Sequence, residues 1–144
     1  MSALYLAALK DQSSRRLEAL SQVQGIEQGI HAIIQSYIDW VVSYPDFARF
    51  LYAAHHSVQT GGHYHTLEQS NSERNQDLKA WLVKQPDAER LKAIPTALLM
   101  SLVIGPTESY CCAWLSGRVK DSPQQYIQAL AQSAWDSLQH FSKI

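Results

Sequence analysis

The sequence predicts an all-α fold, and three observations support this prediction. Apolar residues recur at intervals of three and four along most of the 144 residues, which is the period of an amphipathic helix. Alternation of apolar and polar residues, which would indicate strands, is nearly absent. The six glycines and five prolines stand mostly where a helix would begin or end. We therefore expect six helices in a single domain over residues 1–144, a length that suits one core.

The first predicted helix is under way at Leu4 and ends between Gln22 and Gly25. It carries one mostly apolar stripe at three- and four-residue spacing, which polar side chains interrupt. The stripe consists of Leu6, Leu9, Ser13, Arg16 or Leu17, and Leu20. A second helix is predicted over residues 26–44 and is apolar over most of its circumference, so we expect it to be central. Tyr44-Pro45 ends it, because the residue before proline avoids the helical region.

Further glycines and prolines predict where the remaining helices begin and end. A short helix begins at Pro45 and ends at Gly61-Gly62, and a long one is predicted over residues 64–84. Pro95 opens an apolar helix that Gly105-Pro106 is expected to interrupt and kink and that Gly117 closes. Ser122-Pro123, a capping residue followed by proline, begins the last helix.

Composition and charge exclude several functions. Twelve basic against thirteen acidic residues give a net charge of -1 without a basic cluster, which argues against nucleic-acid binding by this chain alone. The neighbouring Cys111 and Cys112 form neither an easy disulfide nor a chelating pair, which favours a reduced, cytoplasmic location. The longest uncharged stretch, residues 93–107, has 15 residues, so no membrane helix is expected. No nucleophile motif or phosphate-binding loop indicates an enzyme, and no cofactor is expected.

Three stretches resemble the C-terminal regulatory domain of TetR-family transcriptional repressors. They are "LYLAALKD" at residues 4–11, "YIDWVVSYPDFARFL" at residues 37–51, and "IGPTESYCCAWLSGRVKDSPQQYIQAL" at residues 104–130. The last is the most specific, because Gly-Pro inside the penultimate helix and Gly-Arg at its end are frequent in that family. The resemblance implies a six-helix bundle with an effector pocket among the central helices.

The resemblance also implies what this chain would lack. In the family, Leu4 and Tyr5 would begin the helix that joins the DNA-reading head to the regulatory body. No basic head or recognition helix is found in the sequence, so we expect the N-terminal helix-turn-helix domain to be absent from it. A chain without this domain could bind an effector and dimerise, but it could not repress transcription.

A mixture of apolar and polar residues indicates a small-molecule pocket. The long helix over residues 64–84 places Asn71 and Arg74 among apolar neighbours, and the central helix places His31 beside an apolar row. Alternatively, Arg74 pairs with Glu27 or the stripe turns to the surface. With four Trp, seven Tyr and three Phe, an apolar or aromatic effector is favoured. The predicted ligand-binding residues are His31, Tyr37, Phe50, Asn71, Arg74, Trp81 and Leu102.

The last two long helices carry more apolar residues than one buried face needs. The surplus predicts a homodimer in which these helices form a four-helix bundle with their copies, and the family resemblance favours the same pairing. The alternative is that all of these residues belong to the protomer's own core. The predicted interface residues are Tyr110, Trp114, Ile127, Leu130, Ala134 and Leu138.

Four histidines suggest a rival function. His55, His56, His63 and His65 fall within eleven residues, but their spacing does not aim them at one point, so a surface loop is favoured over a metal site. A helical metal or haem binder would need these side chains to converge. A second rival is a headless dimerisation module that pairs with a full-length relative and binds no ligand.

Overall fold

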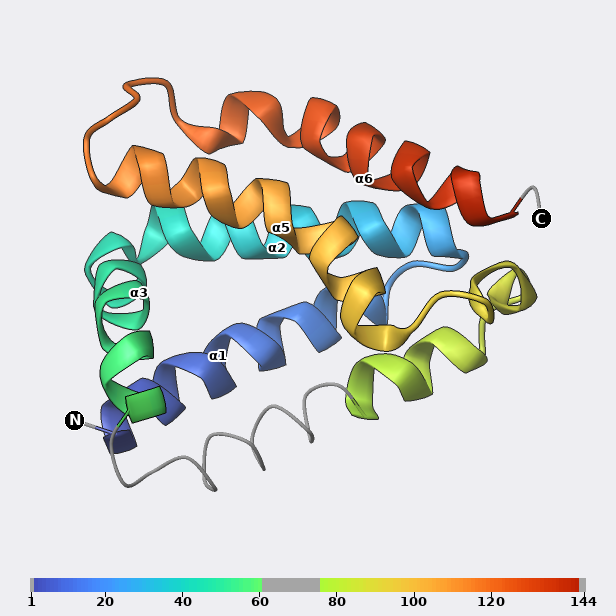
Figure 1. Ribbon diagram of the computed structural model, residues 1–144, viewed down its shortest axis with the longest axis horizontal. Coiled ribbons are helices and arrows are strands. Elements are labelled where there is room, and N and C mark those ends of the chain that lie inside the picture. The colour runs from blue at the N-terminus through green and yellow to red at the C-terminus, as the bar shows by residue number, and fades with distance from the viewer. Residues whose placement is uncertain (1, 61–75, 143–144) are drawn as a thin grey trace.

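The computed structural model describes residues 2–60 and 76–142, and all regular structure within these ranges is helical, which confirms the predicted all-α class (Figure 1). Residues 76–83 are helical up to the turn that begins at Lys84. The helices with defined bounds are α1 (Ser2–Leu20), α2 (Ile26–Ser43), α3 (Pro45–Thr60), the 3₁₀ helix η1 (Ala88–Leu91), α5 (Thr96–Leu115), the 3₁₀ helix η2 (Pro123–Tyr126) and α6 (Ile127–Ser142).

Helix α2 is central, as its apolar circumference predicts. In Figure 1 it runs through the middle of the molecule, with α1 on one side, α6 on the other, and α5 lying over it. Helix α3 crosses one end of this layer, and the 76–83 segment and η1 lie toward the other end. Nine side chains or glycines of α2 are buried, among them Ile34, Ile38 and Val41, which are completely enclosed. Half of its 18 residues are therefore in the core, while Gln28, Gln35 and Asp39 keep one side of α2 exposed.

The beginning of α2 is capped by residues far away in the sequence. Gly25 adopts a φ of 92°, a left-handed conformation that favours glycine, and no side chain next to it caps the helix. Instead, Gln85 Oε1 accepts the Gly25 N–H over 2.8 Å, and Asp87 Oδ1 accepts the Ile26 N–H over 3.1 Å. Because the first N–H groups of a helix lack partners within the helix, these two side chains satisfy its N-terminus from the turn after residue 83.

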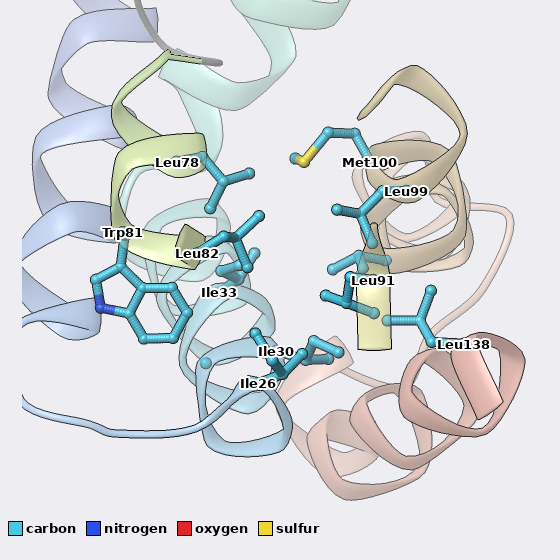
Figure 2. Close-up of a pocket in the computed structure, with 12 residues that line it drawn as sticks. Ile26, Ile30, Ile33, Leu78, Trp81, Leu82, Leu91, Leu99, Met100 and Leu138 are labelled. Atoms are coloured by element: carbon cyan, nitrogen blue, oxygen red, sulfur yellow. The ribbon is translucent and has the colours of Figure 1, made fainter. Parts of the chain in front are cut away.

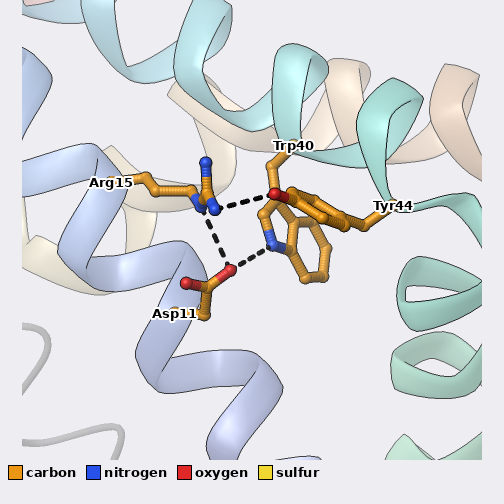
Figure 3. Close-up of polar contacts among 4 residues, drawn as sticks. All are labelled: Asp11, Arg15, Trp40 and Tyr44. Carbon is orange, nitrogen blue, oxygen red and sulfur yellow. Dashed lines mark hydrogen bonds and ion pairs between the residues drawn. The ribbon is translucent and has the colours of Figure 1, made fainter.

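A polar cluster joins α1 to α2 (Figure 3). Asp11 Oδ2 accepts hydrogen bonds from Arg15 Nε over 3.1 Å and from the indole Nε1 of Trp40 over 3.0 Å. Arg15 also donates to the hydroxyl of Tyr44 over 3.1 Å, and its guanidinium lies 4.9 Å from the centre of that ring. The hydrogen bond to Asp11 raises the pKa of Arg15. One carboxylate oxygen thus holds together the outer faces of both helices.

Helix α5 is continuous, which corrects the interruption expected at Gly105-Pro106. Pro106 lies inside the helix, and the ribbon bends partway along its length (Figure 1). A proline removes one backbone hydrogen bond, while the bonds on either side persist and hold the helix together.

The end of α5 is a Schellman motif at the predicted glycine. Gly117 has a φ of 80°, its N–H donates to the Trp114 carbonyl over 3.1 Å, and the Arg118 N–H donates to the Ala113 carbonyl over 2.9 Å. The prediction that Gly117 closes this helix is confirmed. Ser122 caps the next element by accepting the Gln124 N–H over 3.3 Å, and Pro123 follows as predicted, although the first turn is a 3₁₀ helix.

Candidate functional site

A narrow apolar cavity lies where α2, the 76–83 segment, η1, α5 and α6 meet (Figure 2). Figure 2 shows Leu78 and Leu82 on one wall, pointing toward Leu99 and Met100 on the opposite wall. The lining is contributed by helices that are distant in sequence: Ile26, Gly29, Ile30, Ile33, Leu78, Trp81, Leu82, Leu91, Leu99, Met100, Val103 and Leu138.

The cavity lining offers no charge and one polar group, which is already occupied. That group is the indole N–H of Trp81, and it donates to the backbone carbonyl of Leu20 over 2.9 Å, at the last residue of α1. All other lining residues are aliphatic, methionine or glycine. Such a surface recognises an apolar group by shape and by removing its surface from water.

Glycine at position 29 makes room for the Trp81 ring. A β-carbon built at Gly29 would stand 2.7 Å from Trp81 Cζ3, well inside van der Waals contact. The ring therefore packs on bare backbone of α2, and the absence of a side chain at this position sets the location of the indole wall.

The cavity is nearly closed in this conformation. The centre of a water-sized sphere can occupy ≈ 20 Å³ of it, although the total space between its atoms is ≈ 300 Å³. The first value is about that of a single water position, and an apolar space of this kind gives water no partners. A ligand larger than a few atoms must therefore move part of the wall, and Trp81 and Leu82 are only partly buried.

The predicted ligand-binding residues are divided among several environments. Trp81 lies in the cavity wall, as expected. His31 lies instead in an open groove on another face of α2, where its Nε2 is 3.1 Å from Gln128 Oε1. Phe50 and Leu102 are half-buried and pack against the core. Asn71 and Arg74 lie outside the described residues.

The division of α2 into two faces follows from helical geometry. Ile26, Ile30 and Ile33 point into the cavity, while Glu27 and His31 follow them by one position and are therefore rotated by about 100° toward the groove. His31 shares one side of α2 with the buried Ile34, Ile38 and Val41, as the sequence predicts, but it stands at the polar end of this row and lies in the open groove. The apolar row at positions 26, 30 and 33 was the signal for the cavity.

A second set of polar groups is buried away from the cavity lining. The hydroxyls of Tyr37 on α2 and Tyr52 on α3 contact each other. Burial is the main cause that raises the pKa of Tyr52, with smaller effects of Cys111 and Glu108. Burial likewise raises the pKa of the Cys111 thiol to about 12, helped by Cys112 and Glu108. These phenol and thiol groups are therefore neutral at physiological pH and cannot act as nucleophiles there.

Two buried hydroxyls lack partners in the described part of the chain. Ser13 Oγ on α1 and Thr107 Oγ1 on α5 form no hydrogen bond to any described atom, and both residues are among the few buried polar ones. The polar positions noted in the α1 stripe are thus interior rather than surface positions: Gln12, Ser13 and Arg16 are all buried.

The predicted dimer residues fall into two groups. Ala134 and Leu138 are buried within the protomer, and Leu138 lines the cavity, so these two already belong to the protomer's own core. Trp114, Ile127 and Leu130 are half-buried. Tyr110 donates to the Asp121 carbonyl over 2.8 Å, which ties α5 to the loop before α6.

The surface of α5 is unusually apolar for its exposure. Over residues Ala97–Leu115 the mean hydropathy is 1.3, yet only 28% of this stretch is buried, and Leu98 is 40% exposed. By length and composition this is the one helix in the described ranges that could cross a membrane, and it is longer than the 15-residue stretch considered above. Core helices pass the same test, and α5 packs against α2, α3 and α6.

Metal binding finds no support in the described ranges. No cluster of three or more His, Cys, Asp or Glu side chains forms there. His55 and His56 fall within α3, whereas His63 and His65 lie outside the described residues.

The chain matches no protein-family model, and no curated protein matches it.

Proposed function

We propose that this chain is the effector-binding and dimerisation domain of a TetR-type transcriptional regulator. The observation that carries the proposal is the apolar cavity enclosed by α2, the 76–83 segment, η1, α5 and α6. Small-molecule sites are concave and mostly apolar, and this one is built from helices of a single bundle. The sequence resemblance supplies the family, and the all-helical fold is consistent with it.

The lining favours a small apolar or aromatic effector. No side chain in the cavity offers a free hydrogen-bond group, so a polar molecule would lose its contacts with water without replacement. A hydrocarbon or aromatic group loses nothing comparable and gains from leaving water.

The contacts of Trp81 suggest how binding would reach the rest of the molecule. The same residue forms the cavity wall and holds the carbonyl of Leu20 at the end of α1. In the family, the helix that corresponds to α1 leads to the DNA-reading head. An effector that displaces Trp81 would favour a second position of α1, provided that it binds the two arrangements with different affinity.

The surface of α5 supports pairing with a second copy. Leu98 is exposed and Leu102, Ile104 and Trp114 are only half-buried, and a two-fold partner that presents the same surface would cover them. In this proposal the chain senses and pairs in the cytoplasm, while DNA contact belongs to the helix-turn-helix domain of such a regulator. A stable pairing should bury at least about 1,000 Å².

Toluene, a small aromatic hydrocarbon, tests the cavity. We expect it to raise the thermal unfolding temperature of the protein, and at 100 times its Kd the added stability should be about 2.7 kcal/mol. Tryptophan fluorescence should also change, because Trp81 forms part of the cavity wall. Val103→Phe fills the cavity and should abolish this stabilisation, with Met100→Phe as a second filling variant. Ala80→Phe, at an exposed position of the 76–83 segment that lines neither the cavity nor the neighbouring groove, should leave it unchanged.

Sedimentation velocity tests the pairing. The wild type should sediment as a dimer, and Leu98→Glu together with Leu130→Glu should give monomers that remain helical by circular dichroism. Lys10→Glu places the same charge on α1 and should leave the dimer intact. A monomeric wild type would contradict the proposed dimerisation.

The small volume of the closed cavity favours one other function, the dimerisation module that needs no ligand. A dimer that gains no stability from toluene, in the wild type and in Val103→Phe alike, would support that module and overturn effector binding.

A further inference from the structure

A surface groove adjoins the apolar cavity and shares part of its wall. The groove runs between the 76–83 segment, η1 and the beginning of α5, and its volume is ≈ 540 Å³. Leu82, Leu91 and Leu99 line both the groove and the cavity. These three leucines are therefore the partition between the wide groove and the narrow cavity, and Leu82 and Leu91 are only partly buried.

The groove has an apolar floor and a charged rim. Val83, Ile94 and Pro95 extend the leucine surface outward, and Val83 is 64% exposed. The charged groups in the lining are Lys79, Glu89 and Lys92, which give the rim a net positive charge. Glu89 pairs with Lys92 over 2.7 Å, whereas Lys79 forms no ion pair with any residue that the structure describes.

We propose that the groove and the cavity form one site for an amphipathic carboxylate with a single alkyl chain, such as a medium-chain fatty acid. This inference rests on the proposed effector-binding function and names the ligand class of the same site. The carboxylate lies at the groove rim beside Lys79, and the chain passes the leucine partition into the cavity.

Each part of such a ligand matches one part of the site. The ammonium of Lys79 is exposed and can pair with an anion while it remains in water, so the head group keeps most of its hydration. The floor and the cavity offer only apolar contacts to the chain. The groove volume also falls in the range of roughly 300–1,000 Å³ that is usual for small-molecule sites.

The site should select by chain length more than by head group. Each additional methylene that leaves water should tighten binding by roughly fourfold, until the cavity is filled. The contact with an exposed lysine should contribute a factor of roughly two to five, and this part should weaken as salt is added.

Isothermal titration with octanoate, decanoate and decanol, below their micelle concentrations, tests the proposal on the intact chain. We expect decanoate to bind more tightly than both octanoate and decanol. Lys79→Gln should weaken decanoate by about threefold and leave decanol unchanged, and Glu89→Gln should tighten decanoate, because it removes the competing charge from Lys92. Lys120→Gln, in the loop after α5, is the matched control and should change neither ligand.

A larger side chain between the groove and the cavity gives an independent test of the path that the alkyl chain takes. Leu91→Trp, at a partly buried position of η1, should weaken decanoate more than octanoate, because the longer chain must reach farther into the cavity. Circular dichroism and thermal unfolding show whether this variant has kept its fold, and Leu91→Phe serves if it has not.

The outcomes separate this inference from the proposed function. If decanoate and decanol bind equally and neither charge variant matters, the carboxylate site is overturned, while an effector cavity stands. If toluene binds and no alkyl ligand does, the carboxylate inference fails alone. If none of these molecules binds, both fail together.

Discussion

The indole N–H of Trp81 donates to the carbonyl of Leu20 across 61 positions of sequence, and this bond joins the wall of the cavity to the end of α1. Leu20 is the last residue of α1, so its carbonyl has no partner within the helix. Gln85 and Asp87, just beyond the same segment, hold the first N–H groups of α2. The turn between α1 and α2 is therefore held from outside, by the segment that also closes the cavity.

Trp81→Phe should destabilise the protein by about 1–2 kcal/mol. Phenylalanine keeps most of the apolar contact and loses the indole hydrogen bond, which leaves the Leu20 carbonyl with only the longer bond of 3.4 Å from the Val23 N–H. Urea unfolding measures the change. Val83→Ala on the same segment should cost less than about 0.5 kcal/mol, because its side chain is mostly exposed. Equal losses in the two variants would show that the indole bond is not important.

Gly29→Ala should destabilise the protein, although alanine is the better helix former. Its methyl group meets the Trp81 ring, and the displacement should cost about 1–3 kcal/mol, more than the gain of about 1 kcal/mol in helix propensity. Trp81 fluorescence should also shift as the ring moves. Gly29→Ala combined with Trp81→Ala is the matched control, because the three atoms nearest to the added β-carbon all belong to the indole ring, and there the alanine should cost less than in the wild type. A stabilised Gly29→Ala protein would mean that the ring can move freely.

Asp11→Ala should cost more than Arg15→Ala, although both residues belong to the same cluster. Removing the carboxylate leaves the buried Trp40 N–H without an acceptor, at a cost of about 1–3 kcal/mol. Removing the exposed arginine breaks a surface ion pair, which is worth less than about 1 kcal/mol. Chemical denaturation of the two variants and of the double variant measures both terms. A larger loss in Arg15→Ala would assign the stabilisation to the guanidinium instead.

Cys111 should make the protein sensitive to alkaline pH. Burial raises the pKa of its thiol from the ordinary 9.0 to about 12, so the folded state keeps a proton that the unfolded state releases. Stability is complete below pH 9 and should fall by about 1.4 kcal/mol per pH unit as the pH rises toward 12. Cys111→Ala should reduce this slope, and Cys112→Ala should not. A slope that is the same in Cys111→Ala and the wild type would assign the alkaline loss to the buried tyrosines.

Thiol labelling gives a second view of the same pair. Cys111 is completely buried and Cys112 partly exposed, so a thiol reagent should label Cys112 in the folded protein and Cys111 only on unfolding. Mass spectrometry of the labelled protein separates the two sites. Rapid labelling of Cys111 below the unfolding transition would mean that α5 opens locally.

The helix ends were predictable from the sequence because they depend on neighbouring residues. Pro45, Gly117 and Ser122-Pro123 act through their own backbone angles and through hydrogen bonds to residues a few positions away. The interruption expected at Pro106 is absent, because the effect of a proline depends on the helix around it and the bonds on both sides keep α5 continuous, although bent.

The site was only partly predictable, because the signal of a cavity is the same as that of a core. Ile26, Ile30 and Ile33 form an apolar row whether they pack closely or face a space. The contacts of Asp87 and Gln85 with α2 span about 60 positions, and no local pattern predicts them. Trp81 ends the apolar stripe of its helix and lines the cavity, whereas His31 stands at the polar end of its row and lies in the open groove.

Hydrogen exchange at the two amide groups at the start of α2 should depend on what happens in the cavity. The Gly25 and Ile26 N–H groups are protected from hydrogen exchange by Gln85 and Asp87, and those side chains move with the segment that carries Trp81. A molecule that enters by pushing this segment outward should accelerate exchange at both amides, while one that fills the existing space should slow it. The direction of that change would reveal the route of entry without any knowledge of what the protein controls.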